Sequence, residues 1–169
     1  MQDTGYNVAE EKHDRVVSLH TYDKEGRMMV SPQQTPLTGN TVFGGGNGLF
    51  STAGDYLAFC RLFLDNGKAP DGSQLLSPKT IELMGQNHVG DLYAPAGYGF
   101  GLGFGVITNL ADTKALGSVG QLSWSGAFQT FYFIDREENL AAVLMTQINP
   151  YNNFYGRKMP QFVYQAIVE

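Results

Sequence analysis

The sequence predicts an α+β fold in which helices pack against an antiparallel β-sheet. Three observations support this prediction: short strand-like pieces near the start, helical patterns in the middle and at the end, and several strand-like segments between residues 97 and 145. The chain has 169 residues, 43% of them hydrophobic and 16% charged, which is enough apolar material for a buried core. The length fits one domain or a large part of one.

The first 48 residues are predicted to hold little regular structure. Residues 16–22 and 27–30 are two short β-like pieces, and the Asp-Lys-Glu-Gly sequence at 23–26 between them is typical of a turn. Residues 31–48 are rich in Pro, Thr, Gln and Gly, which indicates a loop.

Two helices are predicted in the middle of the chain. The sequence Ser-Thr-Ala-Gly-Asp at 51–55 is typical of a helix start, with a hydroxyl cap and an acidic residue in the first turn. Apolar residues follow at helical spacing, and Asn66-Gly67 ends the pattern. The second helix begins at Ser77-Pro78, with Pro at the first helical position, and is expected to end near Asn87.

The segment 97–107 reads GYGFGLGFGVI, so that glycine alternates with bulky residues. A period of two predicts a single strand with one bare face. Glycine is costly in a strand interior, so the bare face indicates close approach of another backbone or a strong bend. The spacing matches neither the dinucleotide fingerprint nor the phosphate-binding loop.

Two apolar runs, 131–134 and 140–145, follow as strands joined by a hairpin link at 135–139. Both runs are apolar on both faces, so we expect both faces to be covered. The last segment is predicted to be an amphipathic helix with Pro160 in its first turn. Its apolar positions are Met159, Phe162, Val163, Ala166 and Ile167.

Four segments in succession resemble the serine β-lactamase-like superfamily: GLFSTAGDYLAFCRLFLDNG, LLSPKTIELM, GYGFGLGFGV and FYFIDREENLAAVLMTQ. The class C β-lactamases, the related carboxylesterases and the D-alanyl-D-alanine peptidase-like hydrolases are the groups most similar to the chain. The resemblance implies a partial β-lactamase/transpeptidase-like fold and acyl-serine hydrolysis of an ester, amide (peptide) or β-lactam substrate. No cofactor is implied, because serine acyl transfer requires none.

The resemblance implies three motifs, of which two are not found. Ser-x-x-Lys would supply the nucleophile and its base, but none of the lysines has a serine three residues before it, so no nucleophile is predicted in this chain. Tyr151-Asn152-Asn153 matches Tyr-x-Asn as a string but follows the strand of the third motif, so we interpret it as a strand-to-helix loop. His88-Val89-Gly90 matches a third-motif variant, but it follows a helix and is interpreted as a loop.

Trp124-Ser125-Gly126 stands where the third motif, Lys-Thr-Gly or a variant such as Trp-x-Gly, belongs. By resemblance, Ser125 and Gly126 are small because substrate backbone lies against this edge strand, and Ala127 donates its N–H to the oxyanion hole. Trp124 replaces a lysine that would bind a substrate carboxylate, which favours an esterase-like or peptidase-like relative. The alternative is that Trp124 is a core aromatic residue and Ser-Gly a tight bend.

The start, Met-Gln-Asp-Thr-Gly-Tyr, resembles a segment that follows the first two motifs in relatives. We therefore expect residues 1–169 to be the C-terminal part of a longer hydrolase and to be inactive alone. Any targeting signal would lie upstream, so the sequence does not identify the cellular compartment. The strand at 140–146 would then carry an unpaired edge, which predicts a homo-oligomer or association with the missing N-terminal half. The alternative is a non-catalytic binding or interaction module.

Composition argues against several other classes of function. The net charge of −5 disfavours a nucleic-acid partner, and the sequence has no apolar stretch long enough to span a membrane. Cys60, the single cysteine, is predicted to be a buried structural thiol. His13, His20 and His88 lack metal-ligand spacing, so no metal site is predicted.

Overall fold

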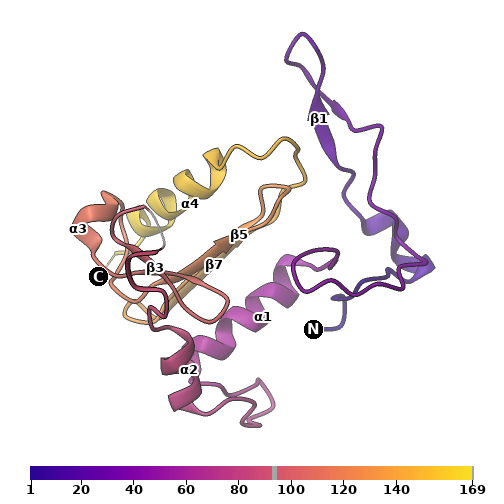
Figure 1. The fold of residues 1–169 in the computed structure, drawn as a ribbon. Coiled ribbons are helices and arrows are strands. Elements are labelled where there is room, and N and C mark those ends of the chain that lie inside the picture. Colours follow the sequence, from indigo (N-terminus) through magenta and orange to yellow (C-terminus); the bar gives the residue numbers. More distant parts are fainter. Residues whose placement is uncertain (93–94, 169) are drawn as a thin grey trace.

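The computed structural model describes residues 1–92 and 95–168, and it confirms the predicted α+β fold with an antiparallel sheet (Figure 1). The main sheet has five strands in the order β3-β4-β5-β6-β7, and each neighbouring pair is antiparallel. The strands are β3 (Tyr98–Phe100), β4 (Gly105–Ile107), β5 (Leu122–Ser125), β6 (Phe131–Asp135) and β7 (Leu140–Leu144).

A separate hairpin, β1 (His20–Tyr22) and β2 (Met28–Val30), projects from the body of the molecule (Figure 1). The turn predicted at 23–26 joins its strands, and the backbone N–H of Gly26 donates to the carbonyl of Asp23 at 3.0 Å. The predicted first strand is shorter than expected, because the residues before His20 are not paired with β2. The short 3₁₀ helix η1 (Glu10–Arg15) precedes the hairpin.

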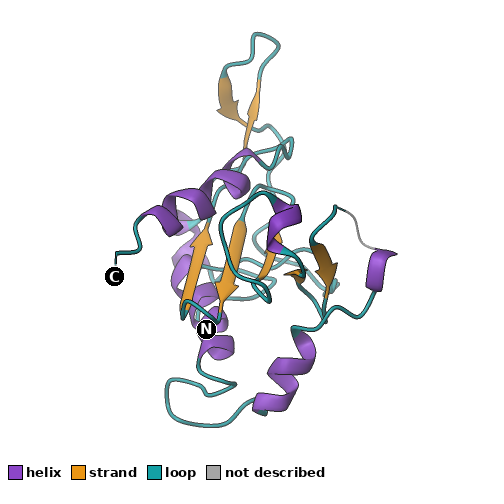
Figure 2. Ribbon diagram, turned by 90° about the vertical axis from the view of Figure 1, so that its left-hand side faces the viewer, coloured by secondary structure: helices purple, strands orange, loops and turns teal. Residues whose placement is uncertain are grey.

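The helices α1 (Ala53–Leu64) and α4 (Phe154–Gln165) cover opposite faces of the sheet (Figures 1 and 2). Neighbouring residues of a strand point to opposite faces, and Tyr132 of β6 contacts Tyr56 of α1 while Phe133 stacks on Tyr164 of α4. The prediction that both faces of β6 are covered is therefore confirmed. The remaining helices are α2 (Pro78–Met84), α3 (Leu110–Thr113) and η2 (Gly90–Leu92).

The predicted hydroxyl caps start the two middle helices. The Oγ1 of Thr52 accepts from the N–H of Asp55 at 3.1 Å, and the Oγ of Ser77 accepts from the N–H of Thr80 at 3.0 Å. The second helix ends at Met84 rather than near Asn87. Its last turn closes on Gly85, whose N–H donates to the carbonyls of Ile81 and Glu82.

The core lies between α1 and the sheet, and α2 adds Ile81 to it. Cys60 and Phe63 on α1 are fully buried, which confirms the prediction of a buried thiol. The ring of Phe63 meets Phe104 edge-on at 4.9 Å. The buried members of this cluster are Cys60, Phe63, Ile81, Phe104, Val106, Leu122, Tyr132 and Ile134.

The prediction of a single strand over 97–107 is wrong, because the segment folds into the β3–β4 hairpin with Tyr98 opposite Ile107. The glycine alternation is as compatible with a tight hairpin as with a strand, and Gly103 at the bend has φ +94°. The expected close approach is present, since a Cβ at Gly101 would lie 2.2 Å from the carbonyl oxygen of Met84.

The last helix begins earlier than predicted. It starts at Phe154, so Pro160 lies inside the helix rather than in its first turn. The apolar face is also rotated, because Phe162 and Ile167 are exposed while Gly156 is buried against the ring of Phe131. Tyr164 of α4 also faces the sheet, where its ring stacks on Phe133. The predicted apolar positions of this helix do not include this tyrosine.

Strand β7 lies at one end of the sheet order, as predicted, and its residues are half-buried because α1 packs beside it. Within residues 1–92 and 95–168, no helix combines the length and apolarity needed to cross a bilayer.

Candidate functional site

The predicted third motif lies at the C-terminal end of β5 and in the turn that follows. Trp124 and Ser125 are the last residues of the strand, and Gly126 and Ala127 begin the turn to β6. The turn is closed by the N–H of Gln129 donating to the carbonyl of Gly126 at 3.0 Å, and by the N–H of Gly126 donating to the carbonyl of Thr130 at 2.9 Å. The structure thus brings all four predicted residues into one short surface segment.

Strand β5 is not an edge strand, so that expectation is corrected. It lies between β4 and β6 in the sheet order. Its register with β4 ends at Ser123, which faces Gly105, because β4 turns back toward β3 at this point. The last residues of β5, Trp124 and Ser125, therefore extend beyond β4. At this end the strand is paired with β6 on one side and has no register with β4 on the other.

Trp124 is neither a core residue nor fully exposed. It shares the α1 face of the sheet with its cross-strand partner Tyr132, and 41% of its surface is exposed. Its ring meets Phe100 edge-on at 4.9 Å, and the backbone of Gly105 lies directly beside it. A Cβ at Gly105 would lie 3.6 Å from the indole ring, an ordinary contact distance, so the ring packs closely over the Gly105 backbone.

Gly126 has a local reason to be small besides the one expected from the resemblance. A Cβ on Gly126 would lie 2.3 Å from the Oγ1 of Thr130, so a larger residue would push this side chain out of the turn. Ala127 is exposed, and in the described parts of the chain no acceptor for its backbone N–H is found. This N–H remains able to donate to a ligand.

Tyr151, which the sequence places in a loop, reaches this segment. Its hydroxyl lies 3.0 Å from the Oγ of Ser125, and either atom can be the donor. The loop assignment of residues 151–153 is confirmed, but sequence reasoning missed the contact with Ser125. The two residues are 26 positions apart, and neither composition nor spacing signals their contact.

Residues 146–150 bind the turn that carries Ala127. The N–H of Ile148 donates to the carbonyl of Phe128 at 3.2 Å, and the Oγ1 of Thr146 donates to the carbonyl of Gln129 at 2.8 Å. The side chain of Gln129 is buried, and its Nε2 donates to the carbonyl of Pro150 at 3.1 Å. The turn and the loop thus form one hydrogen-bonded unit.

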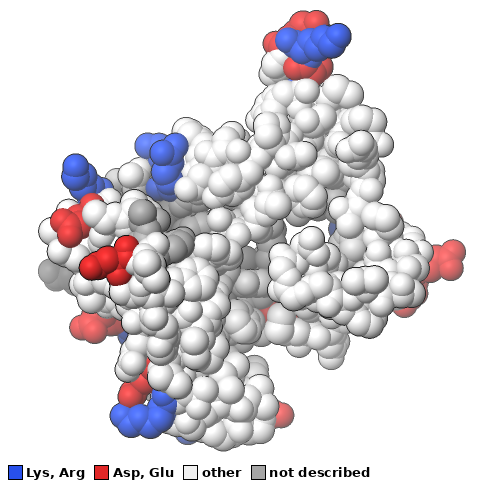
Figure 3. Space-filling model, in the orientation of Figure 1, with Lys and Arg blue, Asp and Glu red and all other residues white. Residues whose placement is uncertain are grey.

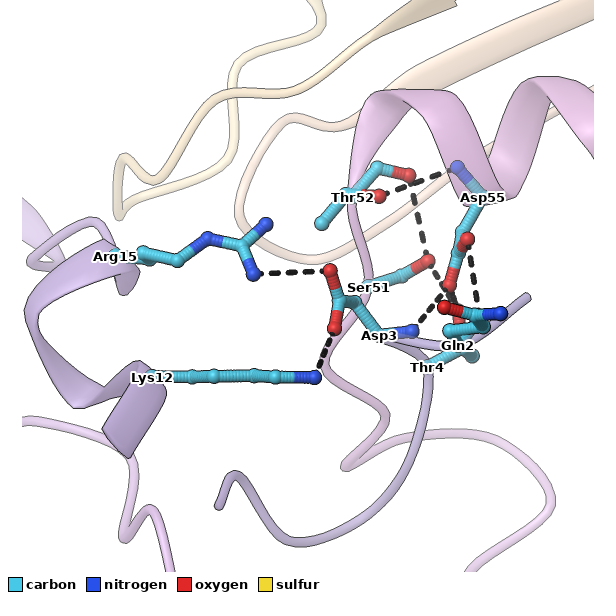
Figure 4. Close-up of polar contacts among 8 residues, drawn as sticks. All are labelled: Gln2, Asp3, Thr4, Lys12, Arg15, Ser51, Thr52 and Asp55. Atoms are coloured by element: carbon cyan, nitrogen blue, oxygen red, sulfur yellow. Dashed lines mark hydrogen bonds and ion pairs between the residues drawn. The ribbon is translucent and has the colours of Figure 1, made fainter. Parts of the chain in front are cut away.

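A second polar cluster lies near the N-terminus, where the first residues meet the start of α1 (Figure 4). The hydroxyl of Thr4 donates to Asp55 Oδ2 at 2.8 Å and lies 2.8 Å from the Oγ of Ser51. Lys12 and Arg15 both bind the carboxylate of Asp3. Ser51 therefore contacts another hydroxyl rather than a lysine, and the cluster joins the N-terminal segment to α1.

The carboxylates of this cluster are stabilised in their charged form. Hydrogen bonds and charge from Lys12, and then from Arg15, lower the pKa of Asp3. Partial burial alone would raise the pKa of Asp55, but the hydrogen bonds from Thr4 and the Asp3 N–H, the charge of the N-terminal amine and the Gln2 N–H together outweigh it, so the pKa is lowered.

The other candidate groups are not arranged for catalysis. Burial raises the pKa of the Cys60 thiol to about 12, which suppresses the reactive thiolate. His88 lies in the loop after α2, where its Nε2 is 2.7 Å from the carbonyl of Leu83. Among residues 1–92 and 95–168, no three His, Cys, Asp or Glu side chains converge as metal ligands would.

Trp124 and Ala127 are exposed at the surface, and Ser125 and Gly126 are half-buried. One shallow hollow of about 320 Å³ lies between α1 and the start of β7, and another of about 350 Å³ lies between η2 and α3. Neither hollow is lined by the third-motif residues. In the view of Figure 3, charged side chains lie at the periphery and the middle of the face is uncharged.

Comparison with known proteins identifies relatives across nearly the whole chain. The model of the Beta-lactamase family matches residues 1–162. Protein Rv1367c of Mycobacterium tuberculosis is 34% identical over 166 residues, which are 89% of this chain and 40% of that protein. A lovastatin esterase of Penicillium rubens is 32% identical over 126 residues, covering 63% of this chain and 30% of that protein.

A solved structure agrees with the fold. EstCE1, described as a hydrolase with promiscuous acyltransferase activity, matches with a TM-score of 0.76 at 23% identity. The match covers 95% of this chain and 46% of EstCE1. The chain therefore spans less than half the length of these relatives.

Proposed function

The chain belongs to the Beta-lactamase family, a family of β-lactamase-like hydrolases, and on that premise we propose that it forms the strand side of an acyl-serine hydrolase site. In this proposal Trp124, Ser125, Gly126 and Ala127 line the site, and the Ala127 N–H donates to the oxyanion. The observation that carries the proposal is this N–H, which belongs to an exposed residue in the turn after β5 and has no acceptor within the described chain.

The nucleophile and its base are proposed to come from a segment outside residues 1–169. Ser-x-x-Lys is absent from the sequence, and the chain spans only 40% of Protein Rv1367c. The serine Oγ would attack the substrate carbonyl while the base takes its proton, and the electrons would move onto the carbonyl oxygen. The Ala127 N–H would stabilise that charge until the leaving group departs and water hydrolyses the acyl-enzyme.

An ester is the substrate class we favour over a β-lactam or a peptide. Trp124 stands where a lysine would attract the carboxylate of a β-lactam, and an apolar indole provides no such charge. The 32% identity to a lovastatin esterase supports the same choice.

The first test is an assay of hydrolysis with nitrocefin and p-nitrophenyl butyrate. The 169-residue chain is assayed alone and together with a separately expressed N-terminal half of a related hydrolase that carries Ser-x-x-Lys. We expect turnover of the ester only with both parts, and no adduct of a serine-reactive phosphonate on this chain. Turnover by the chain alone, with one of its serines labelled, would contradict the proposal and identify another nucleophile.

The role of Ala127 has a sharper test, because the residue occupies the second position of a four-residue turn in which proline is well tolerated. Ala127→Pro removes the N–H with little effect on the backbone, whereas Ala127→Ser retains it. We expect Ala127→Pro to lower kcat about 10²- to 10³-fold in the assembled enzyme. Equal activity of the two variants would exclude this N–H from the oxyanion hole.

A further inference from the structure

Tyr151 contacts the candidate site from outside the motif that defines it. It belongs to the loop between β7 and α4, and its hydroxyl lies 3.0 Å from Ser125, the middle residue of the motif. Ser125 lies on the opposite face of β5 from Trp124, because neighbouring residues of a strand alternate. Tyr151 therefore approaches the motif from the α4 side and leaves the Trp124 side open.

The contact is part of a larger connection between two segments. Five hydrogen bonds join residues 125–129 to residues 146–151, and they involve both backbone and side chains. Four of these bonds hold the far end of the turn, at Phe128 and Gln129, and the Tyr151 bond holds its beginning, at Ser125. Ala127 lies between these two fixed points.

The turn needs such support. Gln129 has φ +67°, a left-handed conformation that is unfavourable for a residue with a side chain. Its amide is buried, and the Oε1 has no hydrogen-bond partner within the described chain. Contacts with the loop offset these costs, and without them the turn would be free to adopt other conformations.

We propose that Tyr151 is a positioning residue of the acyl-transfer site, which holds Ser125 and thereby fixes the orientation of the Ala127 N–H. The expected effect on catalysis rests on the proposed function. The ordering of the turn by Tyr151 is argued from the hydrogen bonds alone. Orientation matters because an oxyanion donor is effective only when it already points at the developing charge. Tyr151 itself touches neither the nucleophile nor the reacting carbonyl in this scheme.

The test uses Tyr151→Phe, which removes only the hydroxyl. Its matched control is Tyr155→Phe: Tyr155 lies four positions further on, is similarly exposed, and has no hydrogen bond to its hydroxyl in the described structure. Amide hydrogen exchange of the 169-residue chain is measured at Gln129 and Ile148. We expect exchange about three- to tenfold faster in Tyr151→Phe, the effect of one lost hydrogen bond, and no change in the control.

Ser125→Ala completes a double-mutant cycle. It should raise the same exchange rates as Tyr151→Phe, and the double variant should add little to either, because both changes remove the same bond. If Tyr151→Phe exchanges like the control, or if the two changes are additive, the proposal is overturned whatever the activity of the protein.

The assembled enzyme provides the second readout. We expect Tyr151→Phe to lower kcat for p-nitrophenyl butyrate about tenfold with little change in KM, since the N–H acts in the transition state. An active assembly in which Tyr151→Phe leaves kcat unchanged overturns the positioning role. If the unmodified assembly shows no hydrolysis, the proposed function fails, and the exchange rates alone decide whether Tyr151 orders the turn.

Discussion

Cys60 shows how burial determines the chemistry of a single residue. The side chain is fully buried between α1 and the sheet, and this desolvation raises the thiol pKa to about 12. At neutral pH the group is a small apolar side chain and carries almost no thiolate.

We therefore expect Cys60 to be unreactive toward a thiol reagent such as DTNB in the folded chain at pH 8, and to react within minutes in denaturant. The measurement is the absorbance of the released thiolate with time. Rapid labelling of the folded chain would contradict the burial of this residue.

Tyr164 makes a polar contact between α4 and the sheet. Its ring stacks on Phe133, and its hydroxyl donates to the fully buried carboxylate of Asp135 at 2.5 Å. The other oxygen of Asp135 accepts from the N–H groups of Glu137 and Glu138 in the β6–β7 link. Burial, and then the neighbouring Asp135, raise the pKa of Tyr164.

Tyr164→Phe is expected to destabilise the fold by about 1.5–3 kcal/mol, because it leaves a buried carboxylate without one of its donors. Urea unfolding followed by circular dichroism measures the loss, and Tyr155→Phe is the control. The raised pKa also predicts that the stability of the unmodified chain falls as the pH rises above about 10, where only the unfolded tyrosine ionises. A Tyr164→Phe variant as stable as the control would show that the contact contributes nothing.

Among the elements, the β3–β4 hairpin depends on glycine for close packing. A Cβ at Gly101 would lie 2.2 Å from the carbonyl oxygen of Met84, a backbone atom at the end of α2. The N–H of Leu102 donates to the same carbonyl at 3.0 Å, so the hairpin and α2 are joined at this point.

Gly101→Ala is expected to cost about 1–3 kcal/mol, because the hairpin and α2 must move apart. Gly45→Ala is the matched control, since a Cβ there meets no atom within 4 Å. Thermal unfolding of the two variants provides the comparison, and equal midpoints would contradict the close approach.

The elements also show where sequence reasoning succeeds and where it fails. The caps at Thr52 and Ser77 depend on a few adjacent residues, so their sequence signal is local and the helix starts are predicted correctly. The hairpin at 97–107 is missed by sequence reasoning, because alternating glycines do not reveal where the chain reverses. The Tyr151–Ser125 contact depends on the packing of the β7–α4 loop against the end of β5, which no local pattern encodes.

The N-terminal segment is attached to α1 by carboxylates whose pKa values are lowered. Asp55 accepts from the N–H of Asp3 at 2.7 Å and from the hydroxyl of Thr4, and Asp3 binds Lys12 and Arg15 (Figure 4). A carboxyl group with a lowered pKa stabilises the fold above its unfolded pKa, and the contribution is lost as the pH falls through the folded value.

We therefore expect residues 1–4 to detach from α1 as the pH falls below about 4, before the sheet unfolds. Amide exchange measured across the acid range should rise first at Gly5 and Phe50, whose backbones pair with each other, and later in β6. Thr4→Val should move the transition to higher pH, because Asp55 loses one donor. Simultaneous exchange of both regions would contradict this order.

For the whole molecule, the position of β7 at the end of the sheet order has the largest consequence. The strand pairs with β6 on one side and ends the sheet order on the other, and Leu57 of α1 borders the hollow beside it. An open edge next to apolar side chains favours pairing with another strand.

We expect the isolated chain to self-associate through this edge at micromolar concentration, as measured by sedimentation velocity. Leu57→Lys should weaken the association by placing a charge beside β7, whereas Leu83→Lys, an exposed leucine on α2, should not. A monomer over the whole concentration range would count against this expectation. Addition of the N-terminal half should compete with self-association if both use the same edge.

The loop at 146–150 has a consequence for how the chain reaches its final form. Besides the turn at 126–130, it pairs with His20, which receives a hydrogen bond from the N–H of Asn149 and donates one to the carbonyl of Gln147. His20 and Gln147 are 127 positions apart (147 minus 20), so this pairing requires a long loop to close, whereas the turn and the loop at 146–150 are near each other in the sequence. Contacts of this kind slow folding, whereas helices and hairpins form early. During refolding, the pairing of this loop with His20 is therefore expected to form after most of the secondary structure is already in place.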